Sequence, residues 1–180
     1  SLDRRQRQMC IRDRFSIPSG SMYPNLKVGD YLFVSKFSYG FSKHSLPFSV
    51  PIIPERIFSK EPKRGEIVVF KTPEDNKTDY IKRVIGLPGD TLEMKNNLIF
   101  INDTKIKIKT INTEQYKSFN VKKNSEILPN NLSYEVYEFE KTFDGLNTNN
   151  FSKIKIPKDN FFVLGDNRDN SQDSRFIGLI

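Results

Sequence analysis

Two serines flank a glycine in residues 17–24 (IPSGSMYP), between Pro18 and Pro24 and directly before a strand-like run. Gly20 permits backbone conformations that other residues avoid, so a neighbouring serine can be presented at a tight turn with its N–H group free. Such a turn can supply a nucleophilic hydroxyl and an oxyanion donor from one loop. An ordinary Ser/Gly/Pro turn has the same composition, and that alternative stays open.

A nucleophilic serine needs a base, and two residues could provide one. The single histidine, His44, lies among Ser and Lys residues in a loop-like stretch, which is typical of a surface side chain. Lysine can replace histidine when burial disfavours its ammonium form and lowers its pKa. Lys82 suits this role best, because alternation in residues 79–86 (DYIKRVIG) places it on one strand face with Tyr80 and Val84. Most lysines in strands extend to solvent instead.

A polar loop, residues 165–175 (GDNRDNSQDSR), follows the apolar run 161–164. Its spaced carboxylates are similar to those of a calcium loop, but Arg175 stands about where a bidentate Glu is required, which argues against calcium. One Cys and one His cannot form a structural zinc cluster. We therefore expect no metal and no cofactor, and interpret the loop as a hydrogen-bonded network that supports a neighbouring site.

Strand signals dominate the rest of the chain from Phe15 onward. The predicted strands are residues 30–34, 66–70, 80–85, 98–101 and 161–164, and a hairpin at Asn102 and Asp103 precedes the alternation of Lys and Ile in residues 105–109. Helical periodicity is scarce, with a turn or two expected in residues 170–177. The predicted fold class is mainly β: an antiparallel β-sheet core with an inserted, smaller β-rich cap region and few short helices.

The chain divides into three predicted parts. Residues 1–14 form a basic tail, either a basic arm or sequence foreign to the protein, and residues 15–94 with 158–180 form the core. Residues 95–157, rich in Asn and Lys and with weaker strand signals, form the inserted cap region. Residues 46–54 (LPFSVPIIP) contain three prolines, which predicts a loop rather than a central strand.

The composition of the 180 residues is that of a folded protein with one domain, or one domain plus a small insertion. The formal charge of +7 invites polyanionic partners, but the five Arg and two Asp of residues 1–14 supply +3 of it. Cys10 has no cysteine to pair with, and no run approaches the roughly 18 apolar residues of a membrane span. As a sequence, this is expected to be a soluble polypeptide.

Taken together, the motifs occur in an order that resembles bacterial type I signal peptidases. The resemblance covers most of residues 15–180 and is weakest in residues 95–157. The matching segments are residues 18–22 with Pro24, 63–70 (KRGEIVVF), 79–83 with 86–90 (GLPGD), and 165–171 with 173–175.

The resemblance implies a Ser-Lys endopeptidase that removes signal peptides from exported proteins. By motif position, Ser21 is the nucleophile and Lys82 the general base, while the Ser19 hydroxyl and the Ser21 N–H group form the oxyanion hole. Ser171 matches the serine that orients the lysine. Two supporting ion pairs are also implied, Asp173 with Arg175 and Asp166 with Arg83.

The resemblance further implies specificity for small side chains at the first and third positions before the cut. The first pocket would be lined by Ile17, Pro18, Met22, Leu26, Tyr80 and Ile81. The third would be lined by Phe15, Leu32, Val69 and Ile81. Ordinary core packing could also explain each residue, and it suffices for Leu32 and Val69.

The implied location is the bacterial cytoplasmic (inner) membrane, with the catalytic domain on the periplasmic, extracytoplasmic side. Expected partners are the signal peptides of preproteins and the lipid surface, with no nucleic acid, and the protein is expected to be a monomer. Family members carry at least one transmembrane helix just before the nucleophile segment, where this chain has the basic tail. The apolar loop at residues 46–54 could contact lipid headgroups or pack on its own domain.

Two alternatives come from other classes of protein. A self-cleaving repressor-type peptidase shares the Ser-Lys chemistry, but the fourteen residues before Phe15 leave no room for a helix-turn-helix. A basic β module that binds nucleic acid would interleave aromatic side chains with Lys and Arg on one face. Most Phe and Tyr residues instead lie in apolar strand contexts.

Overall fold

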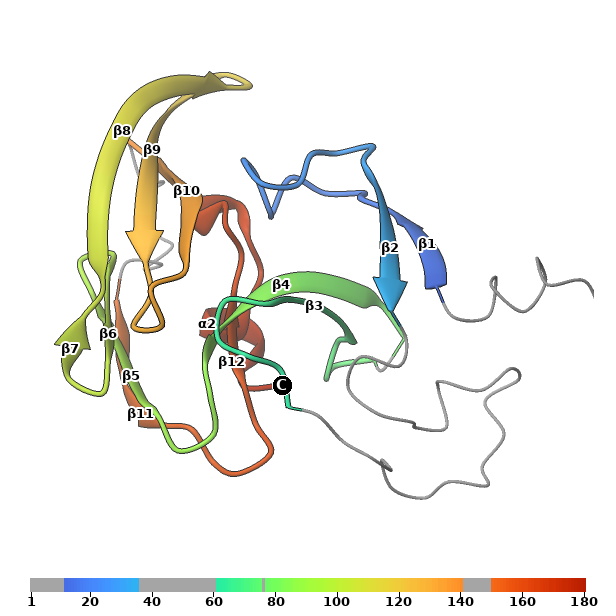
Figure 1. The fold of residues 1–180 in the computed structure, drawn as a ribbon. Helices are drawn as coiled ribbons and strands as arrows, with labels where there is room; N and C mark the ends of the chain where they lie inside the picture. The colour runs from blue at the N-terminus through green and yellow to red at the C-terminus, as the bar shows by residue number, and fades with distance from the viewer. Residues whose placement is uncertain (1–11, 36–60, 76, 141–149) are drawn as a thin grey trace, which may run out of the picture. The chain divides into compact units, whose positions relative to one another are not determined.

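The structure is a computed structural model that describes residues 12–35, 61–75, 77–140 and 150–180. The chain separates into two compact units, one formed by Ser1–Pro18 with Val28–Pro62 and the other by Ser19–Lys27 with Lys63–Ile180. The described elements are antiparallel strands apart from two short helices (Figure 1). This confirms the predicted fold class. Residues 95–157 lie within the second unit together with most of the predicted core, so their separation as a cap stays a prediction.

The described part of the first unit is a two-stranded antiparallel ribbon. Strand β1 (Arg12–Ser16) pairs with β2 (Tyr31–Ser35), and Phe15 lies opposite Leu32. Strand β1 begins inside the predicted tail, because backbone pairing with β2 forms a strand there without any apolar alternation.

The second unit contains three sheets, and the first of them carries Lys82. Strand β4 (Asp79–Gly86) lies between β3 (Ile67–Lys71) and β12 (Phe162–Leu164). The register places Lys82 opposite Val68. Burial increases along β4, from exposed Asp79 to the fully covered C-terminal half of the strand. Lys82 is therefore on the central strand of this sheet.

The second sheet has the order β11-β5-β6-β7. Its strands are β5 (Thr91–Lys95), β6 (Leu98–Ile101), β7 (Thr104–Lys105) and β11 (Phe151–Lys155). The hairpin predicted at Asn102 and Asp103 is confirmed, since both residues have positive φ and join β6 to β7. Asparagine and aspartate tolerate this left-handed conformation in tight hairpin turns.

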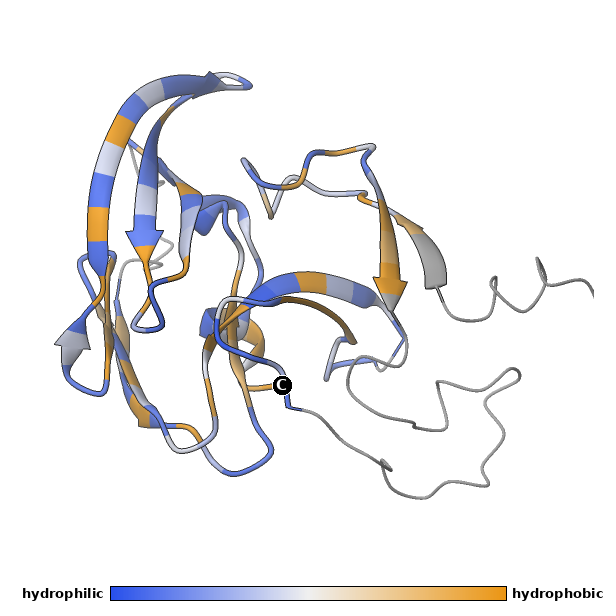
Figure 2. Ribbon diagram, viewed as in Figure 1, coloured by the Kyte–Doolittle hydropathy of each residue, from blue (hydrophilic) through white to orange (hydrophobic). Residues whose placement is uncertain are grey.

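The third sheet consists of β8 (Lys107–Tyr116), β9 (Phe119–Ile127) and β10 (Ser133–Phe139) in the order β10-β9-β8. Strands β8 and β9 are the longest in the described chain, although weaker strands were predicted here. Figure 2 shows that much of both strands consists of hydrophilic residues. Most of β8 is exposed, so it lacks the buried face that produces a strand signal in a sequence.

Two short helices follow β12, namely η3 (Arg168–Asn170) and α2 (Ser174–Ile177). Helix α2 lies within residues 170–177, where a helical turn or two was expected, whereas η3 begins before that range. The main apolar core joins residues of all three sheets. Its buried members are Ile85, Leu92, Met94, Ile99, Ile101, Ile106, Leu128, Tyr134, Val136, Ile156, Phe162 and Leu164.

We predict that Phe162→Ala lowers the free energy of unfolding by about 3–5 kcal/mol, because Phe162 is fully buried and its ring packs 5.2 Å from that of Phe151. Urea denaturation followed by circular dichroism measures the change. Ile111→Ala is the control, since Ile111 is exposed on β8 and should change stability by no more than about 0.5 kcal/mol. Equal losses in the two variants would contradict this assignment of the core.

Candidate active site

The two predicted active-site serines lie in the segment Ser19–Lys27, called the serine turn below. Backbone hydrogen bonds close it locally, from the Tyr23 N–H group to the Gly20 carbonyl (3.3 Å) and from the Leu26 N–H group to the Met22 carbonyl (2.9 Å). Ser21 is buried within the turn. Its hydroxyl oxygen lies 3.3 Å from that of Ser19, so both hydroxyls face the same small region.

Lys82 reaches the serine turn from β4. Its Nζ atom donates a hydrogen bond to Ser21 Oγ over 3.0 Å and a second one to the Ile81 carbonyl over 2.9 Å. The Tyr80 ring lies on the same side of the strand, 5.1 Å from Nζ. The structure therefore brings together Ser21 and Lys82, which are 61 positions apart in the chain.

The Lys82 side chain is almost fully covered, with 4% of its surface exposed. Burial lowers the pKa of Lys82 from 10.5 to about 8, while the charges of Asp173 and Asp166 act in the opposite direction. Desolvation wins because the ammonium form loses its water and gains no carboxylate in direct contact. Near neutral pH, Lys82 therefore holds a much larger fraction of neutral amine than an ordinary lysine does.

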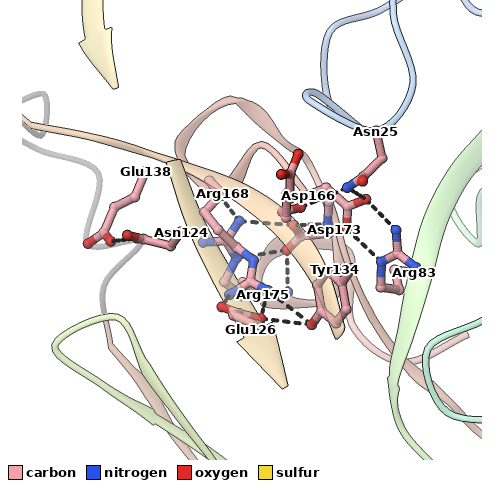
Figure 3. A network of polar contacts seen from close by, with 12 residues as sticks. Asn25, Arg83, Asn124, Glu126, Tyr134, Glu138, Asp166, Arg168, Asp173 and Arg175 are labelled. Atoms are coloured by element: carbon pink, nitrogen blue, oxygen red, sulfur yellow. Dashed lines mark hydrogen bonds and ion pairs between the residues drawn. The ribbon is translucent and has the colours of Figure 1, made fainter. Parts of the chain in front are cut away.

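Each of these two aspartates is bound to an arginine (Figure 3). Arg83 Nε and Nη2 donate to the two Asp166 carboxylate oxygens over 2.8 and 2.7 Å, and Arg83 also donates to the Gly65 carbonyl. Arg175 donates through Nε and Nη2 to Asp173 over 2.8 and 2.9 Å. The second Asp173 oxygen also accepts from the Gly165 N–H group. Both predicted pairs are thus present as two-pronged contacts, which fix orientation as well as charge.

Ser171 lies close to the site, but its hydroxyl does not touch the Lys82 amine in this structure. Its Oγ atom is buried and has no hydrogen-bond partner among the described residues. Ser171 Oγ lies against Gly165. If residue 165 had a side chain, its Cβ atom would lie 2.1 Å from Ser171 Oγ and 2.7 Å from the Ser21 carbonyl oxygen. The lysine-orienting role of Ser171 therefore stays a prediction.

Asn167 and Asn25 also hold the serine turn, and the sequence analysis did not identify either of them. The Asn167 side chain donates to the Gly20 carbonyl, and its backbone N–H group donates to the Ser21 carbonyl, both over 3.0 Å. Asn25 Nδ2 donates to Asp166 Oδ2 over 2.7 Å (Figure 3). Asn167 lies inside the recognised polar loop, but nothing local distinguishes it there from Asn170.

A second buried network lies beside these residues and was also missed. Arg168 binds the Glu126 carboxylate through both terminal nitrogens, and Glu126 accepts from the Tyr134 hydroxyl over 2.7 Å (Figure 3). The backbone carbonyl of Arg168 accepts from Arg175. This network therefore connects β9 and β10 to the Asp173–Arg175 pair. No sequence signal identifies Glu126, because its partner is 42 positions away.

The residues predicted to line the specificity pockets are divided between the two units. Those of the second unit are Met22, Leu26, Val69, Tyr80 and Ile81, and those of the first are Phe15, Ile17, Pro18 and Leu32. Met22 is fully buried, and the register of β3 and β4 pairs Val69 with Ile81. The composition of the pockets stays a prediction.

In the part of the chain that the structure describes, no cluster of three His, Cys, Asp or Glu side chains is arranged to hold a metal ion. The same residues include no helix with the length and apolar character to cross a membrane. Cys10, His44 and the loop at residues 46–54 lie outside the described residues.

Comparison with known proteins assigns the chain to a family. Residues 7–180 match the family described as "Signal peptidase, peptidase S26", and the chain belongs to it. This confirms the resemblance drawn from the motifs. The match begins at residue 7 and so includes more than half of the predicted tail.

Relatives include the signal peptidase I of Rickettsia typhi, which is 39% identical over 93% of this chain and 66% of its own length. That of Rickettsia akari is also 39% identical, over 93% of this chain and 65% of its own length. The chain thus spans about two thirds of the length of these relatives. A crystal structure of a signal peptidase I from Enterococcus faecalis aligns with 67% of this chain and 90% of that chain, at 25% identity and a TM-score of 0.38.

We predict that Lys82 makes stability increase with pH between about pH 8, its folded pKa, and 10.5, its usual value. In that window the unfolded chain holds the proton and the folded chain does not, so unfolding takes up a proton and a higher pH disfavours it. Urea unfolding at several pH values from about 7.5 to 9.5 should show the unmodified protein gaining stability relative to Lys82→Met. Parallel curves for the two proteins would contradict the lowered pKa.

Proposed function

We propose that this chain is the catalytic part of a signal peptidase I, a serine endopeptidase in which Lys82 acts as the base for Ser21. The observation that carries this proposal is the 3.0 Å contact between the Lys82 amine and the Ser21 hydroxyl. A nucleophile and a base within hydrogen-bond reach, with the base held out of water, are the minimum that acyl transfer requires. Membership of the signal peptidase family supports the choice of substrate.

In the first half of the reaction, Ser21 Oγ attacks the scissile carbonyl carbon while its proton passes to the neutral Lys82 amine. The protonated amine then donates that proton to the leaving nitrogen, the peptide bond breaks, and the signal peptide stays attached to Ser21 as an ester. Water attacks the ester after losing a proton to Lys82, and the proton passes to Ser21 Oγ as the ester bond breaks. The enzyme returns to its starting state.

The negative charge on the attacked oxygen needs donors that are in place beforehand. The Ser21 N–H group and the Ser19 hydroxyl are the proposed donors, and the 3.3 Å approach of the two hydroxyl oxygens supports the placement of Ser19 beside the reacting atom. Because the turn is closed by its own backbone hydrogen bonds, these donors need little rearrangement when the charge develops.

The proposed substrates are preproteins with small side chains at the first and third positions before the cut. Met22, Leu26, Tyr80 and Ile81 would limit the size of the first side chain. Cleavage would take place at the extracytoplasmic face of the bacterial cytoplasmic membrane, where signal peptides emerge. The lipid surface is the second proposed partner.

We predict that Ser21→Ala and Lys82→Met each abolish cleavage of a peptide with Ala at the first and third positions before the cut, because each removes a group that takes part in bond making. Ser19→Ala should lower kcat by about 10²–10³-fold, as expected for the loss of one oxyanion donor. Chromatographic separation of the cleaved fragments measures all three rates.

Ser125→Ala is the matched control, since this serine is on β9 and its hydroxyl forms a hydrogen bond with that of Ser133 (2.9 Å). It should cleave at the unmodified rate. Retained activity in Lys82→Met, together with a loss in His44→Ala, would identify a histidine base and contradict the proposal.

We also predict that kcat/KM rises with pH through an inflection near pH 8, because only the neutral form of Lys82 can accept the Ser21 proton. Initial rates across about pH 6 to 10 at substrate concentrations below KM measure the profile. An inflection near 6.5, the usual value for histidine, would contradict lysine as the base.

A further inference from the structure

The serine turn is contacted from one side by the sheet β10-β9-β8, which contains no proposed catalytic residue. The Tyr23 ring lies 4.9 Å from that of Tyr116 and 6.4 Å from that of Tyr137, measured between ring centroids. Asn25 Nδ2 donates to the Glu135 backbone carbonyl over 2.7 Å. The turn is thus in contact with the last residue of β8 and with two residues of β10.

Tyr116 makes the closest of these approaches. It is the only buried residue of β8, a strand that otherwise carries exposed or half-exposed side chains. Its ring belongs to a buried cluster with Val121, Tyr137 and Phe139, and packing in this cluster restricts rotation of the ring. Its hydroxyl is buried and has no hydrogen-bond partner among the described residues. This hydroxyl lies directly against Gly20.

The contact changes the explanation for the glycine between the two serines. A Cβ atom on Gly20 would lie 2.1 Å from the Tyr116 hydroxyl oxygen, far closer than real contacts allow, and 3.3 Å from Tyr116 Cζ. Among the glycines that the structure describes, φ is positive at Gly29, Gly65, Gly89 and Gly178 but not at Gly20. The expected backbone role of Gly20 is therefore wrong for this structure. Glycine is needed here for space, and Tyr116 occupies that space.

Asn167 holds the same part of the serine turn by two hydrogen bonds. Its side chain donates to the Gly20 carbonyl, and its backbone N–H group donates to the Ser21 carbonyl. Asn167 is in turn bridged to Tyr137, whose N–H group donates to the Asp166 carbonyl. The sheet and the polar loop therefore both contact the backbone of the serine turn, the sheet at Gly20 and the loop at Gly20 and Ser21.

We propose that Tyr116 is a positioning residue for the reaction, which makes the sheet β10-β9-β8 a support that sets the conformation of the serine turn. The proposal rests on the proposed function, because the position that matters is that of Ser21 Oγ relative to Lys82 Nζ and of the Ser19 hydroxyl relative to the reacting carbonyl. Tyr116 forms no hydrogen bond with the Ser21 or Lys82 side chain. Its effect passes through the Gly20 Cα atom.

The test is a set of variants at the two facing positions, made in the full protein. Gly20→Ala pushes the turn away from Tyr116 and should lower kcat by about 100-fold with little change in KM, since a misplacement of about 1 Å has that effect on chemistry. Tyr116→Phe removes only the hydroxyl oxygen. In Gly20→Ala/Tyr116→Phe, the ring atom nearest to the new Cβ atom is Cζ, at 3.3 Å. Because this distance is close to an ordinary contact, kcat should rise at least about 10-fold above that of Gly20→Ala.

Tyr137→Phe is the matched control for this rescue. Tyr137 belongs to the same aromatic cluster, but its hydroxyl donates to Glu114 over 2.6 Å and is absent from the atoms facing Gly20. Gly20→Ala/Tyr137→Phe should therefore stay as impaired as Gly20→Ala alone. Rescue by both Phe variants would mean general loosening of the cluster and would overturn the specific role of Tyr116, as would full activity of Gly20→Ala.

Melting temperatures of the same variants separate this proposal from the proposed function. If Ser21→Ala cleaves as fast as the unmodified protein, the proposed function fails, and the contact is judged on Tm alone. Gly20→Ala should then lower Tm, and adding Tyr116→Phe should restore part of the loss. Strictly additive changes in Tm would show that the two residues do not meet, and would overturn the positioning role.

Discussion

An amine that must accept a proton near neutral pH cannot stay in water, where lysine keeps its proton to about pH 10.4. Lys82 is buried, and this burial lowers its pKa to about 8. The nearby carboxylates of Asp166 and Asp173 oppose the shift, and each is bound by its own arginine. The arginines compensate most of the negative charge that would otherwise stabilise the ammonium form. The ion pairs can thus strengthen the scaffold without converting Lys82 into a permanent cation.

The same constraint explains why the site is assembled from distant segments. A buried amine needs cover on every side, and no single strand provides it. Ser21 comes from the serine turn, Lys82 from β4 and Asp173 from the polar loop, and Asn167 joins the loop to the turn by two hydrogen bonds. The buried Glu126–Arg168 pair continues these connections into β9. Removing one member of such a pair leaves an uncompensated buried charge, so the network holds its parts in one arrangement.

The parts that could be predicted from the sequence are those with local causes. Alternation along β4 is a period-two pattern within eight residues, and it correctly puts Tyr80 and Lys82 on one face. The antiparallel, mainly β architecture and the Asn102 hairpin follow from equally local patterns. The start of strand β1 and most of β8 beyond residue 109 were not predicted, because backbone pairing forms these parts without a repeated apolar pattern. The contacts of Glu126 and Asn167 depend on partners that only the folded chain brings near.

Gly20 shows how a correct motif can carry the wrong physical explanation. Glycine between two serines suggests a backbone conformation that other residues avoid, yet the φ angle of Gly20 is not positive, and the restriction comes from Tyr116, 96 positions later in the chain. No local pattern in the sequence of an otherwise exposed strand indicates that one of its residues contacts the turn of the nucleophile. However, such a strand needs an anchor, and the aromatic cluster at its end both anchors the β8–β9 hairpin and packs against Tyr23. The same side-chain packing therefore anchors the sheet and restricts the conformation of the serine turn.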